Sequence, residues 1–323
     1  MANPPYDDHL SVRQPQQLSL QSSLHSATRS LHAQLNKTIM SRFPLCLPPQ
    51  AQDPFAYHLG MIVFGQIFED YECAINKARA TSDAEIEPRH KRIIEQQHTP
   101  SLARTESLQH DREVLHKRLC MHRHNSNDLA AIEGRLQTQA QKQNQHIAQH
   151  IREKPYLALA YTWTMYLALF NGGRHLYRAL SRPGSDFWLE DDDTNSDIEP
   201  LSFWRFDAAN EEDPDADQLK LTFKRNFDAA STLLTDTEAN EVVQEAKSLF
   251  ELCMRLIELL DQMMIEVDQK SKDESDLQPQ LSQESGIATR LWHSLSTSVL
   301  RPAYDLVGWH WARPLQNEVK AAE

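Results

Sequence analysis

Apolar residues recur at steps of three and four along several stretches of the chain, which is the period of an amphipathic helix. The first stretch covers residues 24–39, and Ser22 or Ser23 is placed to cap its start. His32 lies beside this apolar stripe. The preceding residues 1–20 are polar and show no period, so we expect a flexible tail there.

The next part of the chain continues the helical pattern. Asp53 and Pro54 form an N-cap followed by a proline at the first helical position, and they open a buried helix over residues 55–78. Residues 79–100 are mixed and charged, and we expect a connection there. Further helices are expected over residues 102–122 and 129–136, before a glutamine-rich surface stretch that ends at Gln149.

The most apolar stretch follows Pro155 and reads YLALAYTWTMYLALF. At 15 residues it is shorter than the ~20 that a bilayer requires. Asn171, Gly172 and Gly173 come directly after it, and helical spacing then resumes. Two successive glycines cost a helix about 1 kcal/mol each relative to Ala. They indicate either a close contact between helices or a kink where the backbone approaches a planar ligand, and the sequence favours neither.

The last third contains two acidic loops, a helix over residues 219–234 and a long helix that Thr235 or Asp236 caps. We therefore divide the chain into a tail (1–20), one helical domain (21–268), a polar linker (269–285) and an aromatic extension (286–323). Arg301 and Pro302 interrupt the extension, so it is not expected to span a membrane. Docking of this extension onto the helical body is favoured over contact with a membrane surface.

Composition supports an all-α protein and excludes some functions. Only 8 of 323 residues are glycine, whereas β architectures use glycine freely in their turns. The 33 Lys and Arg face 46 Asp and Glu, which gives a net charge of −13 and argues against a nucleic-acid partner. Four scattered cysteines and an acidic start, MANPPYDDHL, predict a cytoplasmic protein, with a peripheral position on an intracellular membrane as the alternative.

The common catalytic motifs are absent from the sequence, including a glycine-rich phosphate loop, H-E-x-x-H, G-x-S-x-G and paired CxxC. One group invites a metal hypothesis, because His116, Cys120, His122 and His124 fall within nine residues. A zinc site needs four well-placed ligands, and the second pair has no clear geometry. We therefore favour surface histidines here.

Four segments, in chain order, carry a resemblance to one known protein family. LHSATRSLHAQLNKTIM, which starts at Leu24, resembles the proximal-helix motif L-x-x-A-T-x-x-x-H, which ends in the axial ligand of heme. YTWTMYLALFNGGRHLYRAL, from Tyr161, is similar to the distal helix, which kinks at its glycines. KLTFK and QEAKSLFELCMRLIELL resemble a basic segment at the heme edge and a late helix. Together these segments resemble the heme oxygenase family. The resemblance covers about residues 20–268 and implies an all-α fold that holds heme between two helices.

The resemblance also implies roles for individual residues. His32 would be the axial ligand of the heme iron, a role that suits neutral imidazole. Gly172 and Gly173 match the distal glycines, and Tyr166 matches a distal tyrosine. The residues that match cations near the heme propionates are Arg29, Lys220 and Lys224, with His25 at a position where Lys is common in animal members.

One departure bears on catalysis. The family pattern Gly-Asp-Leu-Ser-Gly-Gly corresponds here to residues 168–173, and Leu169 replaces the Asp. In the family, that Asp anchors the water network that supplies protons during oxygen activation. A leucine has neither donor nor acceptor. Asn171 lies about 200° further round an ideal helix, so it could substitute only if the kink redirects it.

Three hypotheses follow from the residues and the resemblance. The first, which we favour, is a heme oxygenase that cleaves heme to biliverdin, CO and iron with O2 and electrons from a reductase. The second, motivated by Leu169, is a protein that binds or buffers heme without cleaving it. The third is a helical interaction protein without heme, in which His32 is a core residue and the glycine pair is a packing notch.

Overall fold

The computed structural model describes residues 19–82, 85–122, 126–190, 200–206 and 214–277. Every regular element in these ranges is helical, so the predicted all-α class is confirmed. The predicted tail, except for its last residues, and the predicted aromatic extension 286–323 lie outside the described residues. The principal helices are α1 (Leu20–Arg42), α2 (Phe55–Ala80), α3 (Pro88–Gln97), α4 (Thr105–His122), α5 (Ser126–Asn144), α6 (His146–Glu153), α7 (Ala158–Ala168), α8 (Arg174–Leu180), α9 (Ser185–Trp188), α10 (Pro214–Ser231) and α11 (Asp236–Leu277).

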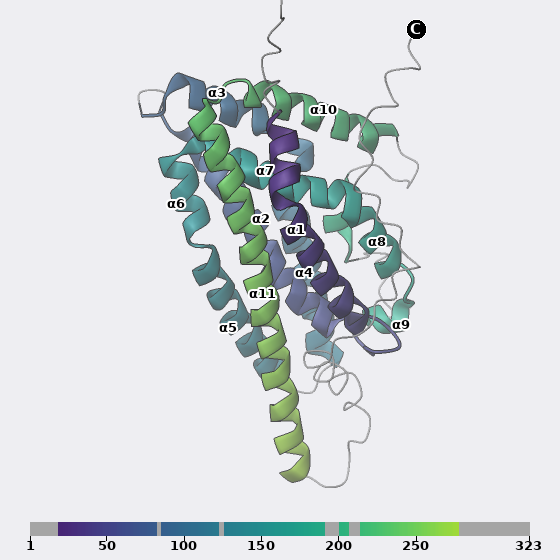
Figure 1. Ribbon diagram of the computed structural model, residues 1–323. Helices are drawn as coiled ribbons and strands as arrows, with labels where there is room; N and C mark the ends of the chain where they lie inside the picture. Colours follow the sequence, from purple (N-terminus) through teal and green to yellow (C-terminus); the bar gives the residue numbers. More distant parts are fainter. Residues whose placement is uncertain (1–18, 83–84, 123–125, 191–199, 207–213, 278–323) are drawn as a thin grey trace, which may run out of the picture.

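Helix α2 forms the centre of the bundle (Figure 1). It packs against α4, α5, α6 and α11 and also contacts α3 and α7. The sequence explains this position, because α2 is apolar on most of its sides and most of its residues are buried. Burial on all faces is typical of a helix that is surrounded by others.

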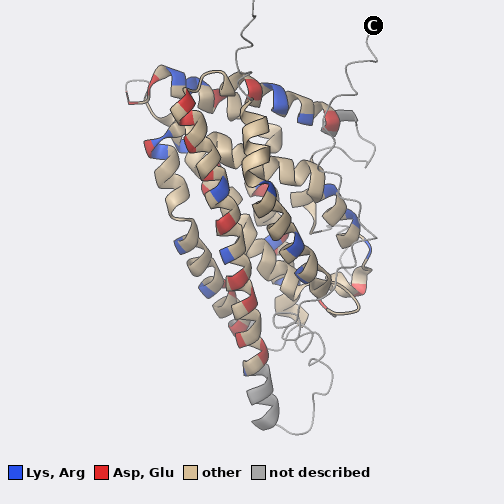
Figure 2. Ribbon diagram, in the orientation of Figure 1, with Lys and Arg blue, Asp and Glu red and all other residues tan. Residues whose placement is uncertain are grey.

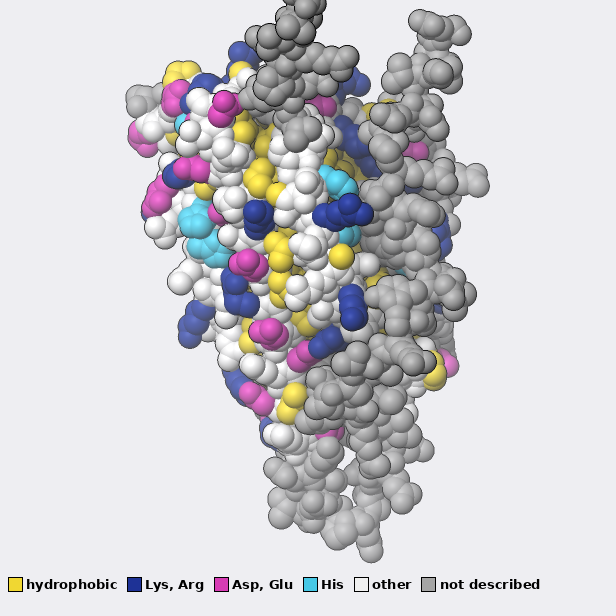
Figure 3. Space-filling view, viewed as in Figure 1, with side chains coloured by type: hydrophobic (Ala, Val, Ile, Leu, Met, Phe, Trp, Pro, Cys, Tyr) yellow, Lys and Arg dark blue, Asp and Glu magenta, His cyan; other side chains and the backbone are white. Residues whose placement is uncertain are grey.

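Helix α1 packs mainly against α11. Basic residues follow the lower half of α1 and acidic residues follow α11 (Figure 2), and Arg42 bonds Asp261 across the pair at 2.9 Å. The space-filling view shows apolar side chains between the charged ones along this seam (Figure 3). Both charged groups are partly buried, so this ion pair stabilises the fold more than a fully exposed pair would.

The structure differs from the sequence predictions in two places. The cap of α1 is Ser19, whose Oγ accepts from the backbone N–H of Ser22, one turn before the predicted cap. The expected connection over 79–100 contains α3, which the sequence conceals because only Ile93 and Ile94 supply its buried apolar side. A helix with so small an apolar face gives little periodic signal.

The long helix α11 starts as predicted. Thr235 Oγ1 accepts from the backbone of Glu238, and Glu238 accepts in return from the Thr235 backbone at 2.7 Å, which is a capping box. The helix continues to Leu277, so the first part of the predicted linker 269–285 is helical. Within the described ranges, none of the helices combines the length and apolarity needed to cross a membrane.

Candidate functional site

His32 lies on α1, where the helix faces α11. Its ring is half-buried and meets the Phe250 ring edge-on, with centroids 5.9 Å apart. Burial, and then the charge of His25, lower the pKa of His32 below its ordinary value. The imidazole is therefore neutral at neutral pH, which is the form that binds a metal.

Two other predicted residues share this part of α1. His25 and Arg29 are both exposed, seven and three residues before His32. Residues three, four and seven apart lie on one side of a helix, so the structure keeps all three on neighbouring parts of the same surface. Their exposure suits contact with a charged group at the edge of a ligand.

The glycine pair lies in a π-helical turn, η4 (Leu169–Gly173), between α7 and α8. The chain changes direction between those helices (Figure 1). Wide turns of this kind are rare and occur often at functional sites. The irregularity that Gly172 and Gly173 suggested in the sequence is therefore present, as one turn of π-helix.

Packing within the chain does not require glycine at position 173. A Cβ added to Gly173 would lie 3.5 Å from Trp204 and 3.6 Å from Leu169, which are ordinary contacts. Gly65 is different, because a Cβ there would lie 2.6 Å from Leu108, a fully buried residue. Packing too close for a Cβ is therefore found at Gly65 and not at Gly173.

The aromatic side chain opposite Gly173 is Trp204, which sequence analysis missed. Its Nε1 donates to Tyr57 of α2 at 2.9 Å. The short segment η5 (Ser202–Trp204) is anchored by Asp111, a fully buried carboxylate that accepts from Ser202 and from the backbone of Phe203 at 2.8 Å. Burial raises the pKa of Asp111 in spite of these bonds. Asp111 on α4 therefore positions η5, the segment that carries Trp204, beside η4.

The polar groups of η4 face α10. Lys220 Nζ donates to Asn171 Oδ1 at 2.7 Å, while Leu169 is buried at 5% exposure. The kink therefore does not put Asn171 in the place of Leu169. Lys224, one turn further along α10, is half-buried. Of the two predicted cations of α10, Lys220 thus contacts η4 directly.

Tyr166 is buried one turn before η4. Its hydroxyl donates to Glu72 Oε1 at 3.0 Å, and burial followed by the charge of Glu72 holds the pKa of Tyr166 well above its ordinary value. Glu72 also accepts from the backbone of Arg104 and Thr105 at the start of α4. Tyr166 is therefore a neutral hydroxyl with a fixed partner.

The histidines that suggested a metal site are only partly brought together. Cys120 Sγ lies 3.5 Å from His116 Nε2, as their spacing on one helix predicts. His122 Nδ1 instead lies 3.0 Å from the carbonyl oxygen of Arg118, and His124 lies outside the described residues.

Comparisons with known proteins agree with this architecture. The sequence model of a family described as "Heme oxygenase" matches residues 18–259. Among curated proteins, the sequence finds no match.

Solved heme oxygenases share the fold. Heme oxygenase 2 from Chlamydomonas reinhardtii, without heme, superposes with a TM-score of 0.53 at 19% identity, over 75% of this chain and 97% of that one. Heme oxygenase-2 from Synechocystis sp. PCC 6803, with heme and NO, gives 0.51 at 18%, over 76% and 86%. Heme oxygenase-1 from the same cyanobacterium, with heme, gives 0.50 at 17%, over 80% and 99%. The family match spans most of the chain and the fold agrees with it, so this chain belongs to the heme oxygenase family.

Proposed function

We propose that this protein is a heme oxygenase that cleaves heme to biliverdin, CO and iron, with His32 as the axial ligand. The observation that carries the proposal is His32 itself, because the histidine of the proximal-helix motif is half-buried and its pKa is lowered by burial. A neutral imidazole on a helix is the usual proximal ligand of heme iron. Heme would be both substrate and cofactor, O2 the oxidant and a reductase the source of electrons.

The residues on both sides are chemically suited to heme. Phe250 offers an aromatic edge beside the His32 ring, and a porphyrin is a large apolar ring system. At Gly173 the chain omits a Cβ for which its own packing has room. Glycine allows close approach of a ligand to the backbone, and we propose that a planar ligand uses this at the glycine pair.

The charged residues suit an anionic ligand edge. Arg29 and His25 project from α1, and Lys220 and Lys224 from α10. The protein carries a net charge of −13, so a local group of cations is needed to attract carboxylates. We propose that these side chains bind the two propionates, as charge-assisted hydrogen bonds.

Bound heme supplies the iron at which O2 is reduced, and the chain must supply protons and exclude bulk water. Leu169 cannot donate a proton or order water. The polar pair on the same turn is Asn171 with Lys220, an ammonium group 2.7 Å from the amide oxygen. We propose that this pair positions water at the η4 end of the site in place of the missing carboxylate.

A second candidate function is binding of heme without cleavage. The burial of Leu169 favours it, because an apolar side chain stands where family members hold the carboxylate of the proton-supplying network. This alternative keeps His32 and the cations in their proposed roles and removes only the proton delivery. Turnover therefore separates the two functions.

The direct test is hemin addition to the purified chain, followed by reductant and O2. We expect a shifted Soret band at one heme per chain, and then biliverdin absorbance with release of iron. A bound heme that only cycles between redox states would support the buffering alternative. An unchanged hemin spectrum would exclude both functions.

Substitution of Gly173 separates ligand approach from packing. Gly173→Ala should leave the free energy of unfolding within about 1 kcal/mol of wild type, because the new methyl makes ordinary contacts. The same variant should lower biliverdin formation about tenfold, a loss of ~1.4 kcal/mol. The matched control is Gly65→Ala, which should destabilise the fold by about 1–3 kcal/mol through overpacking against Leu108. Equal destabilisation by both would show that Gly173 is a packing residue.

A further inference from the structure

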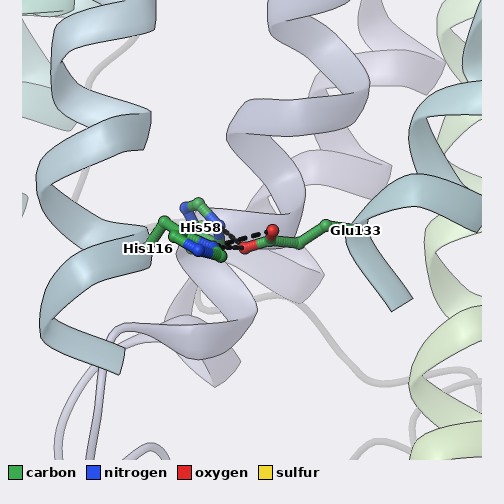
Figure 4. A group of neighbouring side chains, drawn as sticks. All are labelled: His58, His116 and Glu133. Carbon is green, nitrogen blue, oxygen red and sulfur yellow. Dashed lines mark hydrogen bonds and ion pairs between the residues drawn. The ribbon is translucent and has the colours of Figure 1, made fainter. Parts of the chain in front are cut away.

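Three helices bring metal-ligating side chains together at a place far removed in sequence from the proximal motif. His58 comes from α2, His116 from α4 and Glu133 from α5 (Figure 4). His58 Nε2 lies 2.6 Å from Glu133 Oε1, and His116 Nδ1 lies 2.9 Å from Glu133 Oε2. One ligating atom from each residue lies within 4.8 Å of the others. Small side-chain movements can bring these three atoms to coordination distance from one ion.

The cluster is closed on its inner side and accessible on the other. His58 is 1% exposed, whereas the side chain of His116 is 39% exposed and that of Glu133 is 17% exposed. An ion could therefore enter past His116 and meet His58 at the bottom. A site with a buried inner ligand and an open outer one keeps a position for water.

The charge of the cluster suits a cation. Burial lowers the pKa of His58, so its ring is neutral at neutral pH. Burial opposes ionisation of Glu133, but the hydrogen bonds from His58 and His116 outweigh it and lower the pKa of Glu133. The nearby Arg112 is bonded to Glu69 at 3.2 Å, which reduces its repulsion of a bound cation.

Both rings can present a lone pair to an ion. His58 Nδ1 is buried without a hydrogen-bond partner. The hydrogen bond to Glu133 places the proton on Nε2 in the metal-free cluster, and it can move to the unpartnered Nδ1 when Nε2 binds a metal. On the other ring, Cys120 Sγ lies 3.5 Å from His116 Nε2 and can accept a hydrogen bond from its N–H while Nδ1 faces the ion.

We propose that His58, His116 and Glu133 bind one divalent transition-metal ion, with Zn²⁺ as the ion and with water at the fourth position. Two imidazole nitrogens and one carboxylate form a donor set that zinc uses with water. Calcium and magnesium prefer sites built from oxygen alone. The ion would connect α2, α4 and α5, and its binding would be independent of heme.

The test uses the full chain, stripped with a chelator and then dialysed. Titration with Zn²⁺ against a chromophoric chelator should show one tight site, and Co²⁺ should give visible d–d bands, whereas Mg²⁺ should not compete. The midpoint of thermal unfolding should rise about 5–10 °C at a hundredfold excess of free Zn²⁺ over Kd. All readouts are taken without heme.

Variants locate the ion. His116→Ala and Glu133→Gln should each weaken Zn²⁺ binding at least about tenfold. The matched control is His110→Ala on the same helix, an exposed histidine, which should bind as wild type does. Circular dichroism of the metal-free variants checks that each is folded; a variant that fails is replaced by His116→Gln. Absence of a tight site in wild type, or equal binding by wild type and both cluster variants, would overturn the proposal. The three residues would then only form hydrogen bonds that connect their helices.

Discussion

Replacement of His32 by Ala should abolish the His-ligated Soret species and lower biliverdin formation at least about 100-fold, since even residues outside the first coordination shell commonly cost 10–100-fold. The physical reason is loss of the only proposed protein bond to the iron. The fold should survive, because the His32 ring is only half-buried. Absorption spectroscopy during hemin titration is the measurement.

Two controls make that result specific. Exogenous imidazole should occupy the space left in His32→Ala and restore a His-like spectrum, whereas a misfolded variant would not respond. His110→Ala removes an exposed histidine of α4 and should bind heme as wild type does. An unaltered Soret band in His32→Ala would show that another residue is the ligand.

Replacement of Glu72 by Ala should lower the free energy of unfolding by about 3 kcal/mol. Its carboxylate accepts from the backbone N–H groups of Arg104 and Thr105 and from the hydroxyls of Thr105 and Tyr166. Removal leaves these donors without their acceptor, mostly in buried positions, and also removes the anion at the start of α4. The midpoint of thermal unfolding should fall by about 6–12 °C.

The neighbouring Cys73 provides the control for this loss. It follows Glu72 on α2 and is exposed, so Cys73→Ala should change stability by no more than about 0.5 kcal/mol. Similar melting of Glu72→Ala and Cys73→Ala would mean that water replaces the carboxylate at little cost.

The period of apolar residues predicts most of the fold. Residues 24–39 and 55–78 form helices as expected, because each presents a broad apolar side. The helix α3 escapes this reasoning because its ten residues bury few apolar side chains. Its position depends on packing against α10 and α2, which are distant in sequence.

The residues of the candidate site likewise fall into those that the sequence predicts and those that it does not. Motif residues on one helix, such as His32 with Arg29, could be predicted because their relative positions follow from local geometry. Trp204 and Asp111 could not, because the segment that carries Trp204 meets Asp111 of α4 only after the chain has folded back. The His58 and Glu133 pair was missed for the same reason, although the spacing of His116 and Cys120 gave half of that cluster.

The wide turn at Leu169–Gly173 restricts how this part of the protein can evolve. A π-turn contains one residue more than an α-turn, so loss of one residue here would rejoin α7 and α8 as a continuous α-helix and remove the wide turn. Arg174, which bonds Asp217 of α10 at 3.1 Å, is the first residue after this turn. Replacements within the turn keep its length and change only the side chains that it presents, whereas loss of a residue removes the turn itself.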